Sequence, residues 1–152
     1  MPKPIVLAAL LCDRVLIEAD GSVSIIRIAD KLIYGKPPQM PEGITPMGQV
    51  QFFMALRSGE LEGTFPMKLF LLQPNAERNL IAEASLRLAG LDQGQNVTVP
   101  INVPIHQDGM NWVEVEFNGE VLTTIPVMVI EARPPMDELK SNEPADSPRE
   151  PE

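Results

Sequence analysis

The chain has 152 residues, including 16 prolines and a single cysteine, and it carries a formal net charge of −9. This length allows one domain plus a short appendage, and the apolar and charged fractions are those of a globular protein. One cysteine excludes an internal disulfide bond. The 12 basic residues are scattered rather than gathered into a stripe, which argues against a nucleic-acid or anionic-membrane partner.

A short apolar segment near the N-terminus superficially resembles a lipoprotein signal. Ile5–Cys12 follows Lys3, but its eight residues are at the lower limit for such a segment. Pro4 interrupts its entry, and Leu11 stands where such a signal needs a small residue. Because the chain continues from Cys12 directly into a hairpin pattern, we favour a first β-strand of a cytoplasmic protein over secretion.

Two hairpin patterns dominate the sequence. Each has two apolar runs joined by a turn pair: residues 14–19 and 22–29 around Asp20-Gly21, and residues 111–117 and 120–130 around Asn118-Gly119. Glycine accepts the positive φ that a type I′ turn requires. We therefore expect a type I′ hairpin at each pair.

Further segments between these hairpins alternate with the period of a strand, namely Gln49–Arg57, Met67–Leu72 and Val97–Ile105. The last of these contains Pro100 and Pro104, which have no amide hydrogen to donate, so it should lie at a sheet edge. Residues 80–91 fit either a helical stripe or a half-buried strand. We favour a strand, because no N-cap precedes the segment and the neighbouring strands need a partner.

Two proline-rich segments lack the pattern of regular structure. Pro37–Pro46 predicts a long crossing loop of the kind that a Greek-key sandwich requires. Residues 133–152 contain five prolines and six acidic residues with almost nothing apolar to bury, which predicts a disordered tail. The expected fold is all-β: an antiparallel, immunoglobulin-like β-sandwich of about seven to nine strands over residues 1–132, with a disordered acidic C-terminal tail over residues 133–152.

Residues that could support catalysis are few. His106 is the only histidine, so the one nucleophilic dyad to consider is Cys12 with His106. Glu114 and Glu116 share a strand face, as paired carboxylates do in glycosidases, but a solvated strand face looks the same. We favour the structural interpretation in both cases and expect no enzyme, no metal site and no cofactor.

Trp112 is the most informative side chain for binding. If Val113, Val115 and Phe117 face the core, Trp112 lies on the outer face of its strand, and outward tryptophans are enriched in protein interfaces. The alternative, left open, is that the tail, a loop or Met128 covers it. The interface candidates comprise Trp112, Phe53, Phe70, Glu114 and Glu116.

The turn and strand motifs resemble a domain-of-unknown-function family of small bacterial proteins over about residues 5–132. They are Leu11-Cys-Asp-Arg-Val15, Ala19-Asp-Gly-Ser-Val-Ser-Ile-Ile26, the proline-rich loop, Asp108-Gly109, Asn118-Gly119-Glu120 and Leu122-Thr-Thr-Ile-Pro-Val127. The resemblance implies a β-sandwich and provides no catalytic residues to assign.

The expected function is therefore that of a non-enzymatic bacterial module that binds another protein or itself, through the face around Trp112 or through an edge strand. One alternative is a structural subunit of a larger, phage-like assembly. Another is a small-ligand binder that uses loops near Pro37–Pro46 and His106. The tail segment Pro135–Leu139 could be a docking motif, although we favour a merely solubilising role for the tail.

Overall fold

The structure is a computed structural model that describes residues 2–35 and 43–132. These residues form nine strands: β1 (Ile5–Ile17), β2 (Val23–Ile28), β3 (Lys31–Tyr34), β4 (Met47–Arg57), β5 (Glu62–Leu72), β6 (Arg78–Ala89), β7 (Gly94–Pro104), β8 (Gly109–Phe117) and β9 (Glu120–Glu131). The described residues contain no helix, and hence none that could span a membrane.

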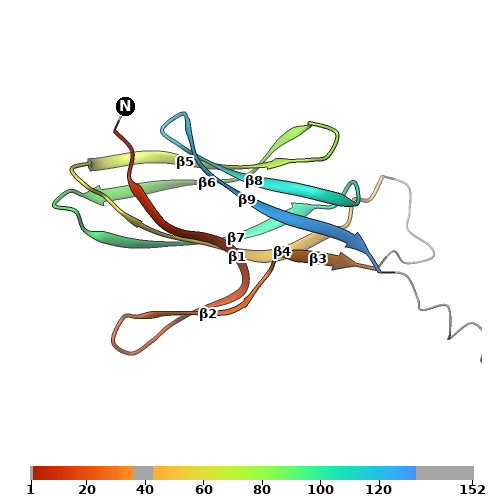
Figure 1. Cartoon of the computed structure of the whole chain (residues 1–152), viewed down its shortest axis with the longest axis horizontal. Coiled ribbons are helices and arrows are strands. Elements are labelled where there is room, and N and C mark those ends of the chain that lie inside the picture. Colours follow the sequence, from red (N-terminus) through yellow and green to blue (C-terminus); the bar gives the residue numbers. More distant parts are fainter. Residues whose placement is uncertain (1, 36–42, 133–152) are drawn as a thin grey trace, which may run out of the picture.

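The strands form two sheets that pack face to face (Figure 1). One sheet has the order β2-β1-β4-β7, and the other has the order β3-β9-β8-β5-β6. The predicted all-β, immunoglobulin-like sandwich is thus confirmed. One pairing departs from the antiparallel rule, because the four-residue strand β3 runs parallel to β9. β3 could not be predicted from the sequence pattern, because so short a strand carries almost no alternation.

The core lies between the two sheets and follows from the alternation of each strand. In β4, the even-numbered residues from Val50 to Leu56 are buried and point inward. Met67, Leu69 and Leu71 of β5 face them from the opposite sheet, together with the apolar residues of β8. The strand prediction for residues 80–91 is confirmed as far as Ala89, where β6 ends, and residues 90 and 91 lie in the turn that follows. Leu86 and Leu88 of β6 are buried in the core.

The two predicted hairpins have different turns. Asn118 and Gly119 both have positive φ, 49° and 84°, as a type I′ turn requires. The prediction of a type I′ turn at Asp20-Gly21 is wrong, because only Gly21 is left-handed there. Glu18 and Ser22 close a three-residue loop through a 2.7 Å backbone hydrogen bond from Glu18 N–H to Ser22 C=O. The longer loop needs a left-handed residue only at its last position.

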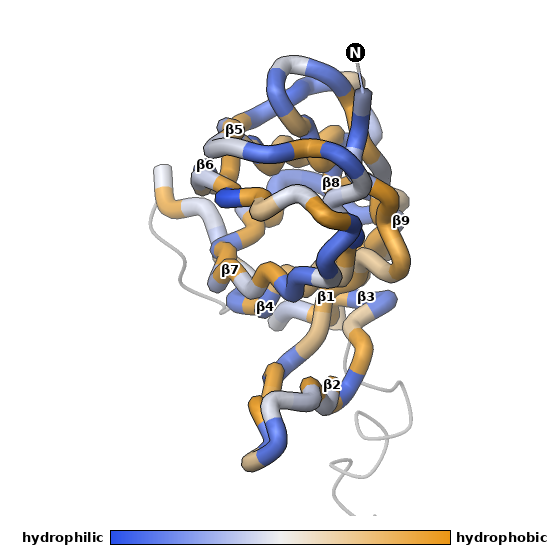
Figure 2. The backbone as a smooth tube through the Cα atoms, turned by 90° about the vertical axis from the view of Figure 1, so that its left-hand side faces the viewer, coloured by the Kyte–Doolittle hydropathy of each residue, from blue (hydrophilic) through white to orange (hydrophobic). Residues whose placement is uncertain are grey.

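Two features of the sheet edges bear on binding. β7 is an edge strand, as Pro100 and Pro104 predicted. At the other edge of the same sheet, the β1–β2 hairpin projects away from the sandwich (Figures 1 and 2). The predicted tail and residues 36–42 of the predicted crossing loop lie outside the described residues.

Candidate protein interface

The outer face of the five-stranded sheet carries the side chains singled out in β8. Val113, Val115 and Phe117 are buried in the core, so Trp112, Glu114 and Glu116 point outward by strand alternation. The Trp112 side chain is 41% exposed. The predicted orientation of β8 is therefore confirmed, and among the described residues the neighbours of Trp112 cover only part of its surface.

Apolar residues of adjacent strands surround Trp112. In the sheet register, Trp112 lies between Pro126 of β9 and Leu72 of β5, and Met110 lies opposite Met128. We call this surface the Trp112 face; it consists of Ile33, Leu72, Leu80, Met110, Trp112, Pro126, Met128 and Ile130. Large parts of Ile33, Leu80, Met110 and Ile130 are exposed. A connected apolar surface of this kind, on the outside of a sheet, is typical of a binding site.

Arg78 of β6 forms a polar clamp at one side of the Trp112 face. Its Nη2 donates hydrogen bonds to Glu114 Oε1 at 2.7 Å and to Glu116 Oε2 at 3.0 Å, and its Nε donates to Glu114 Oε1 at 3.0 Å. These contacts raise the pKa of Arg78, the hydrogen bond with Glu114 contributing most. Arg78 thereby offsets part of the charge of the two glutamates and holds both in fixed positions, which counts against the paired-carboxylate interpretation.

Phe70 is part of this clamp rather than a freely exposed aromatic. It lies on β5 opposite Glu114, and the guanidinium carbon of Arg78 stands 3.5 Å from the centre of its ring. This is the geometry of a cation–π contact. Phe70 does point outward as predicted, but Arg78 covers it in part.

Phe53 is not available as an interface residue, and this prediction is wrong. Its side chain points away from the core on the other sheet, but it is only 6% exposed. β4 is a central strand, so Phe53 has Leu10 of β1 on one side and Thr98 of β7 on the other. A position in a central strand, with a paired strand on each side, leaves little of a side chain exposed, and alternation within one strand does not reveal this.

The structure does not assemble the nucleophilic dyad. Cys12 is fully buried opposite Gln51 in the middle of its sheet, whereas His106 is exposed beyond the end of β7. Burial raises the pKa of the Cys12 thiol, which disfavours the reactive thiolate. Within the described part of the chain, no three His, Cys, Asp or Glu side chains gather into a metal-binding group.

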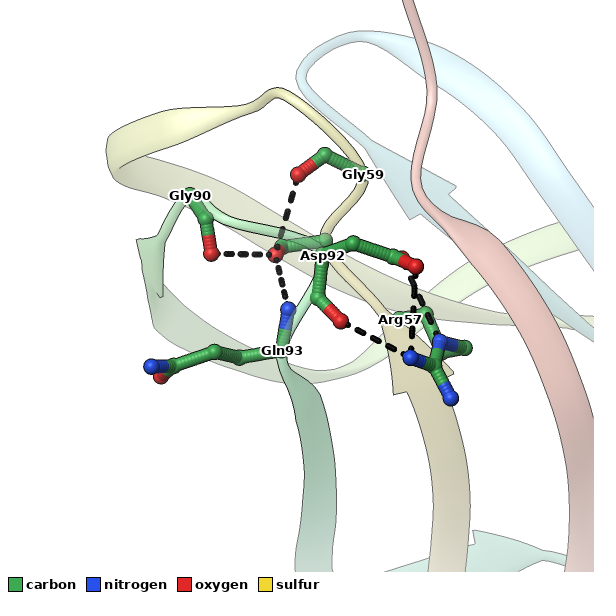
Figure 3. Close-up of polar contacts among 6 residues, drawn as sticks. Arg57, Gly59, Gly90, Asp92 and Gln93 are labelled. Carbon is green, nitrogen blue, oxygen red and sulfur yellow. Dashed lines mark hydrogen bonds and ion pairs between the residues drawn. The ribbon is translucent and has the colours of Figure 1, made fainter.

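A second feature lies at the end of the sandwich where β7 begins, opposite to the end that carries His106. The β4–β5 and β6–β7 turns are joined there by hydrogen bonds (Figure 3). Asp92 N–H donates to Gly59 C=O at 2.7 Å, and Arg57 binds both carboxylate oxygens of Asp92 at 3.2 Å. Ile5 and the exposed Leu91 help to line a groove of about 590 Å³ beside these turns. The predicted ligand loops lie elsewhere, and residues 36–42 of them fall outside the described residues.

Several residues of the Trp112 face were missed from the sequence. Ile33 belongs to the unpredicted strand β3, and its place on the sheet depends on pairing with Ile130, far away in the chain. Arg78 and Leu80 reach the outer face because the β5–β6 register shifts between Leu69 and Phe70. Met110 was the missed residue that the sequence could most easily have predicted, because it lies two positions before Trp112 on β8 and therefore points to the same face.

Comparison with known proteins adds little beyond the fold. No protein-family model matches the chain. No curated protein matches it significantly either, so the family resemblance of its turn motifs gains no support.

Three solved structures illustrate the structural likenesses. A β-glucosidase from Listeria innocua in complex with isofagomine has 12% identity and a TM-score of 0.48, over 82% of this chain and 16% of that one. β-Glucosidase 3B from Thermotoga neapolitana has 14% identity and a TM-score of 0.46, over 58% of this chain and 15% of that one. An immunoglobulin-like protein from Pseudomonas aeruginosa has 13% identity and a TM-score of 0.37, over 84% and 97% of the two chains. The chain spans only about a sixth of the β-glucosidases, and at these values no likeness carries an argument about activity or partners.

Proposed function

We propose that the chain is a non-enzymatic protein-interaction module that presents the Trp112 face to a partner protein. The observation that carries the proposal is the exposure of Trp112 within a connected apolar surface on a rigid sheet. Tryptophan buries a large area with few rotatable bonds, and such residues dominate the binding energy of many interfaces.

Charge supports a protein as the partner. The net charge of −9 disfavours nucleic acid and anionic lipid, which would repel the molecule. Two cations border the Trp112 face: Arg78 is already bound to Glu114 and Glu116, and Lys31 lies beside Met128 at the opposite side. The face therefore offers apolar contact area flanked by a polar clamp whose arginine is already paired, a combination of apolar centre and polar rim that suits a protein surface.

The rigidity of the site also supports binding. Trp112 stands on a strand paired on both sides, and Arg78 ties β6 to β8 across Phe70. A surface that is already ordered loses little conformational entropy when it binds. We further propose that the protein works in the cytoplasm, which the single, buried and unpaired Cys12 supports.

The test compares two full-length, tagged variants in the native cell. Trp112→Glu places a charge in the centre of the Trp112 face, whereas Leu91→Glu places the same charge on an exposed apolar residue at the end of the sandwich. We expect the wild type and Leu91→Glu to retain a stoichiometric partner and Trp112→Glu to lose it, with binding weakened by at least about tenfold.

Equal melting temperatures of the two variants would show that both are folded. Recovery of the same partner at the same level with Trp112→Glu would contradict the proposed function. Recovery of the bait alone in every case would also count against a stable heterologous partner.

A further inference from the structure

The two sheets end in four edge strands, and three of them are protected against pairing with another strand. β7 carries Pro100 and Pro104, and β3 is only four residues long and begins with Lys31. β6 contains an irregularity in its pairing and presents charged residues such as Glu83 and Arg87. Prolines, short length, bulges and charges are the usual means of preventing edge-to-edge association.

The fourth edge, β2, has much weaker protection. Its sequence, Val-Ser-Ile-Ile-Arg-Ile, contains no proline, its one charged residue is Arg27 near its end, and none of its residues is buried. It belongs to the β1–β2 hairpin, which projects from the sandwich (Figure 2). On this hairpin Ile17 is 78% exposed, Ile28 is 62% exposed, and Leu16 and Ile26 are also exposed. A two-stranded hairpin is only marginally stable in water without further contacts, so these apolar side chains indicate a surface that is covered on binding.

The backbone of β2 is oriented for strand addition. Glu18 and Ser22 form a hydrogen-bonded pair, and such pairs alternate with non-bonded ones along an antiparallel ladder. The N–H and C=O groups of Val23 and Ile25 therefore point away from β1, toward the free edge. Arg27, with φ of 54°, ends this regular stretch.

The charges of the hairpin make it complementary to itself. Glu18 and Asp20 stand at its tip, and Arg14 stands at its base, beside Arg27, whose Nε forms a 3.4 Å ion pair with Asp13 Oδ2. When two such hairpins lie side by side in opposite directions, the acidic tip of each one faces Arg14 of the other. The positions of the two charged side chains next to β2 also suit this pairing. Arg14 lies beside Ile26, and Glu18 accepts a 2.7 Å hydrogen bond from the Ser24 hydroxyl.

We propose that a second copy of this chain adds its β2 antiparallel to β2, about a two-fold axis at Ile25, to give a dimer with one continuous sheet. In this register, Ile26 of each copy lies opposite Ser24 of the other. Arg14 then extends across Ile26 toward the Glu18 carboxylate of the second copy. The proposal does not rest on the Trp112 face, which lies on the other sheet and stays free.

Sedimentation velocity on the full chain over a range of concentrations tests the dimer. We expect the wild type to dimerise reversibly and Arg14→Glu or Glu18→Arg to weaken dimerisation by about tenfold each, because each places like charges in contact. The double variant, and an equimolar mixture of the two single variants, should regain the dimer. Arg87→Glu makes the same charge change on an edge strand of the other sheet, and it should leave dimerisation unchanged.

A second variant tests the backbone pairing. Ile25→Pro removes an amide hydrogen that points outward, without removing a β1–β2 hydrogen bond, and it should abolish the dimer while far-ultraviolet circular dichroism stays unchanged. A wild type that sediments as a monomer at every concentration would overturn the proposal. A dimer that persists in Ile25→Pro and in both charge-reversal variants would also overturn it. If that dimer were lost in Trp112→Glu, the dimer contact would be assigned to the Trp112 face instead.

Discussion

Gln73 is a buried side chain whose two amide atoms, Oε1 and Nε2, have no hydrogen-bond partner within the described part of the chain. A buried polar group without a partner costs about 1–3 kcal/mol. Gln73→Met keeps the length of the side chain and removes both polar atoms. We therefore expect the free energy of unfolding, measured in urea, to rise by about 1 kcal/mol.

Asn111 provides the matched control for this prediction. It is equally buried, but its Nδ2 donates a 3.1 Å hydrogen bond to Gly109 C=O. Asn111→Leu should lower the free energy of unfolding, because it leaves that carbonyl without its partner. A loss of stability in Gln73→Met would contradict the account and would indicate that ordered water satisfies the amide.

Tyr34 gives a prediction for the pH dependence of stability. Its hydroxyl donates a 2.8 Å hydrogen bond to Asp108 Oδ1, and this bond is the largest of the effects that raise the pKa of Tyr34 to about 12, from an ordinary 10.0. A raised pKa means that the protonated phenol stabilises the fold. The contribution is therefore complete below pH 10 and is lost as the pH rises from about 10 to 12.

Tyr34 is the only tyrosine, so the absorbance of tyrosinate reports its titration alone. The native protein should titrate with a midpoint near 12, and Asp108→Asn should move the midpoint toward 10 because the carboxylate charge is gone. Glu131→Gln should have a smaller effect, since Glu131 is the weakest of the contributing groups. An unchanged midpoint in Asp108→Asn would show that the hydrogen bond does not control this pKa.

At the scale of elements, the β6–β7 turn stores backbone strain. Leu91 and Asp92 both have positive φ, 56° and 52°, where a type I′ turn prefers asparagine or glycine. A left-handed residue that is not glycine costs roughly 1 kcal/mol, and asparagine tolerates this region better than leucine. Leu91→Asn should raise the free energy of unfolding by about 0.5–1 kcal/mol, and Leu91→Val should lower it.

The side chain of Leu91 is 88% exposed, so neither substitution disturbs the core. Thermal unfolding of the two variants and the wild type should therefore rank asparagine above leucine and leucine above valine. If valine matched asparagine, the turn would not hold Leu91 in the left-handed region.

Which elements were predictable depends on whether their signals are local. Alternation and turn pairs predicted the two hairpins and placed the prolines of β7 at an edge, because those effects act within a few residues. β3 was missed, since its pairing with β9 joins segments almost a hundred positions apart in the chain. The loop at Asp20-Gly21 was assigned the wrong turn type, because the same dipeptide fits both a two-residue and a three-residue loop.

In the candidate site, too, only the features set by local sequence could be predicted. The outward orientation of Trp112, Glu114 and Glu116 is set by alternation in β8 alone, and the sequence predicted it. The cover over Phe53 comes from two other strands, and the clamp by Arg78 comes from the irregular β5–β6 register. Neither could be predicted before the strand order was known.

At the scale of the whole molecule, two surfaces stand out on a strongly acidic chain. The Trp112 face lies on the outside of the five-stranded sheet, and the β1–β2 hairpin projects from the edge of the four-stranded sheet. Because they lie on different sheets, one can bind a partner while the other pairs with a second copy. A dimer would then present two Trp112 faces and bind a multivalent partner with increased avidity.

Site-specific photo-crosslinking in living cells would show directly whether the Trp112 face contacts another protein. A photoreactive phenylalanine derivative replaces Trp112 in one version of the full chain and Leu91 in another. We expect a heavier adduct with a partner polypeptide at position 112 and none at position 91. No adduct at position 112, or equal adducts at both positions, would contradict the claim that the Trp112 face is a binding surface.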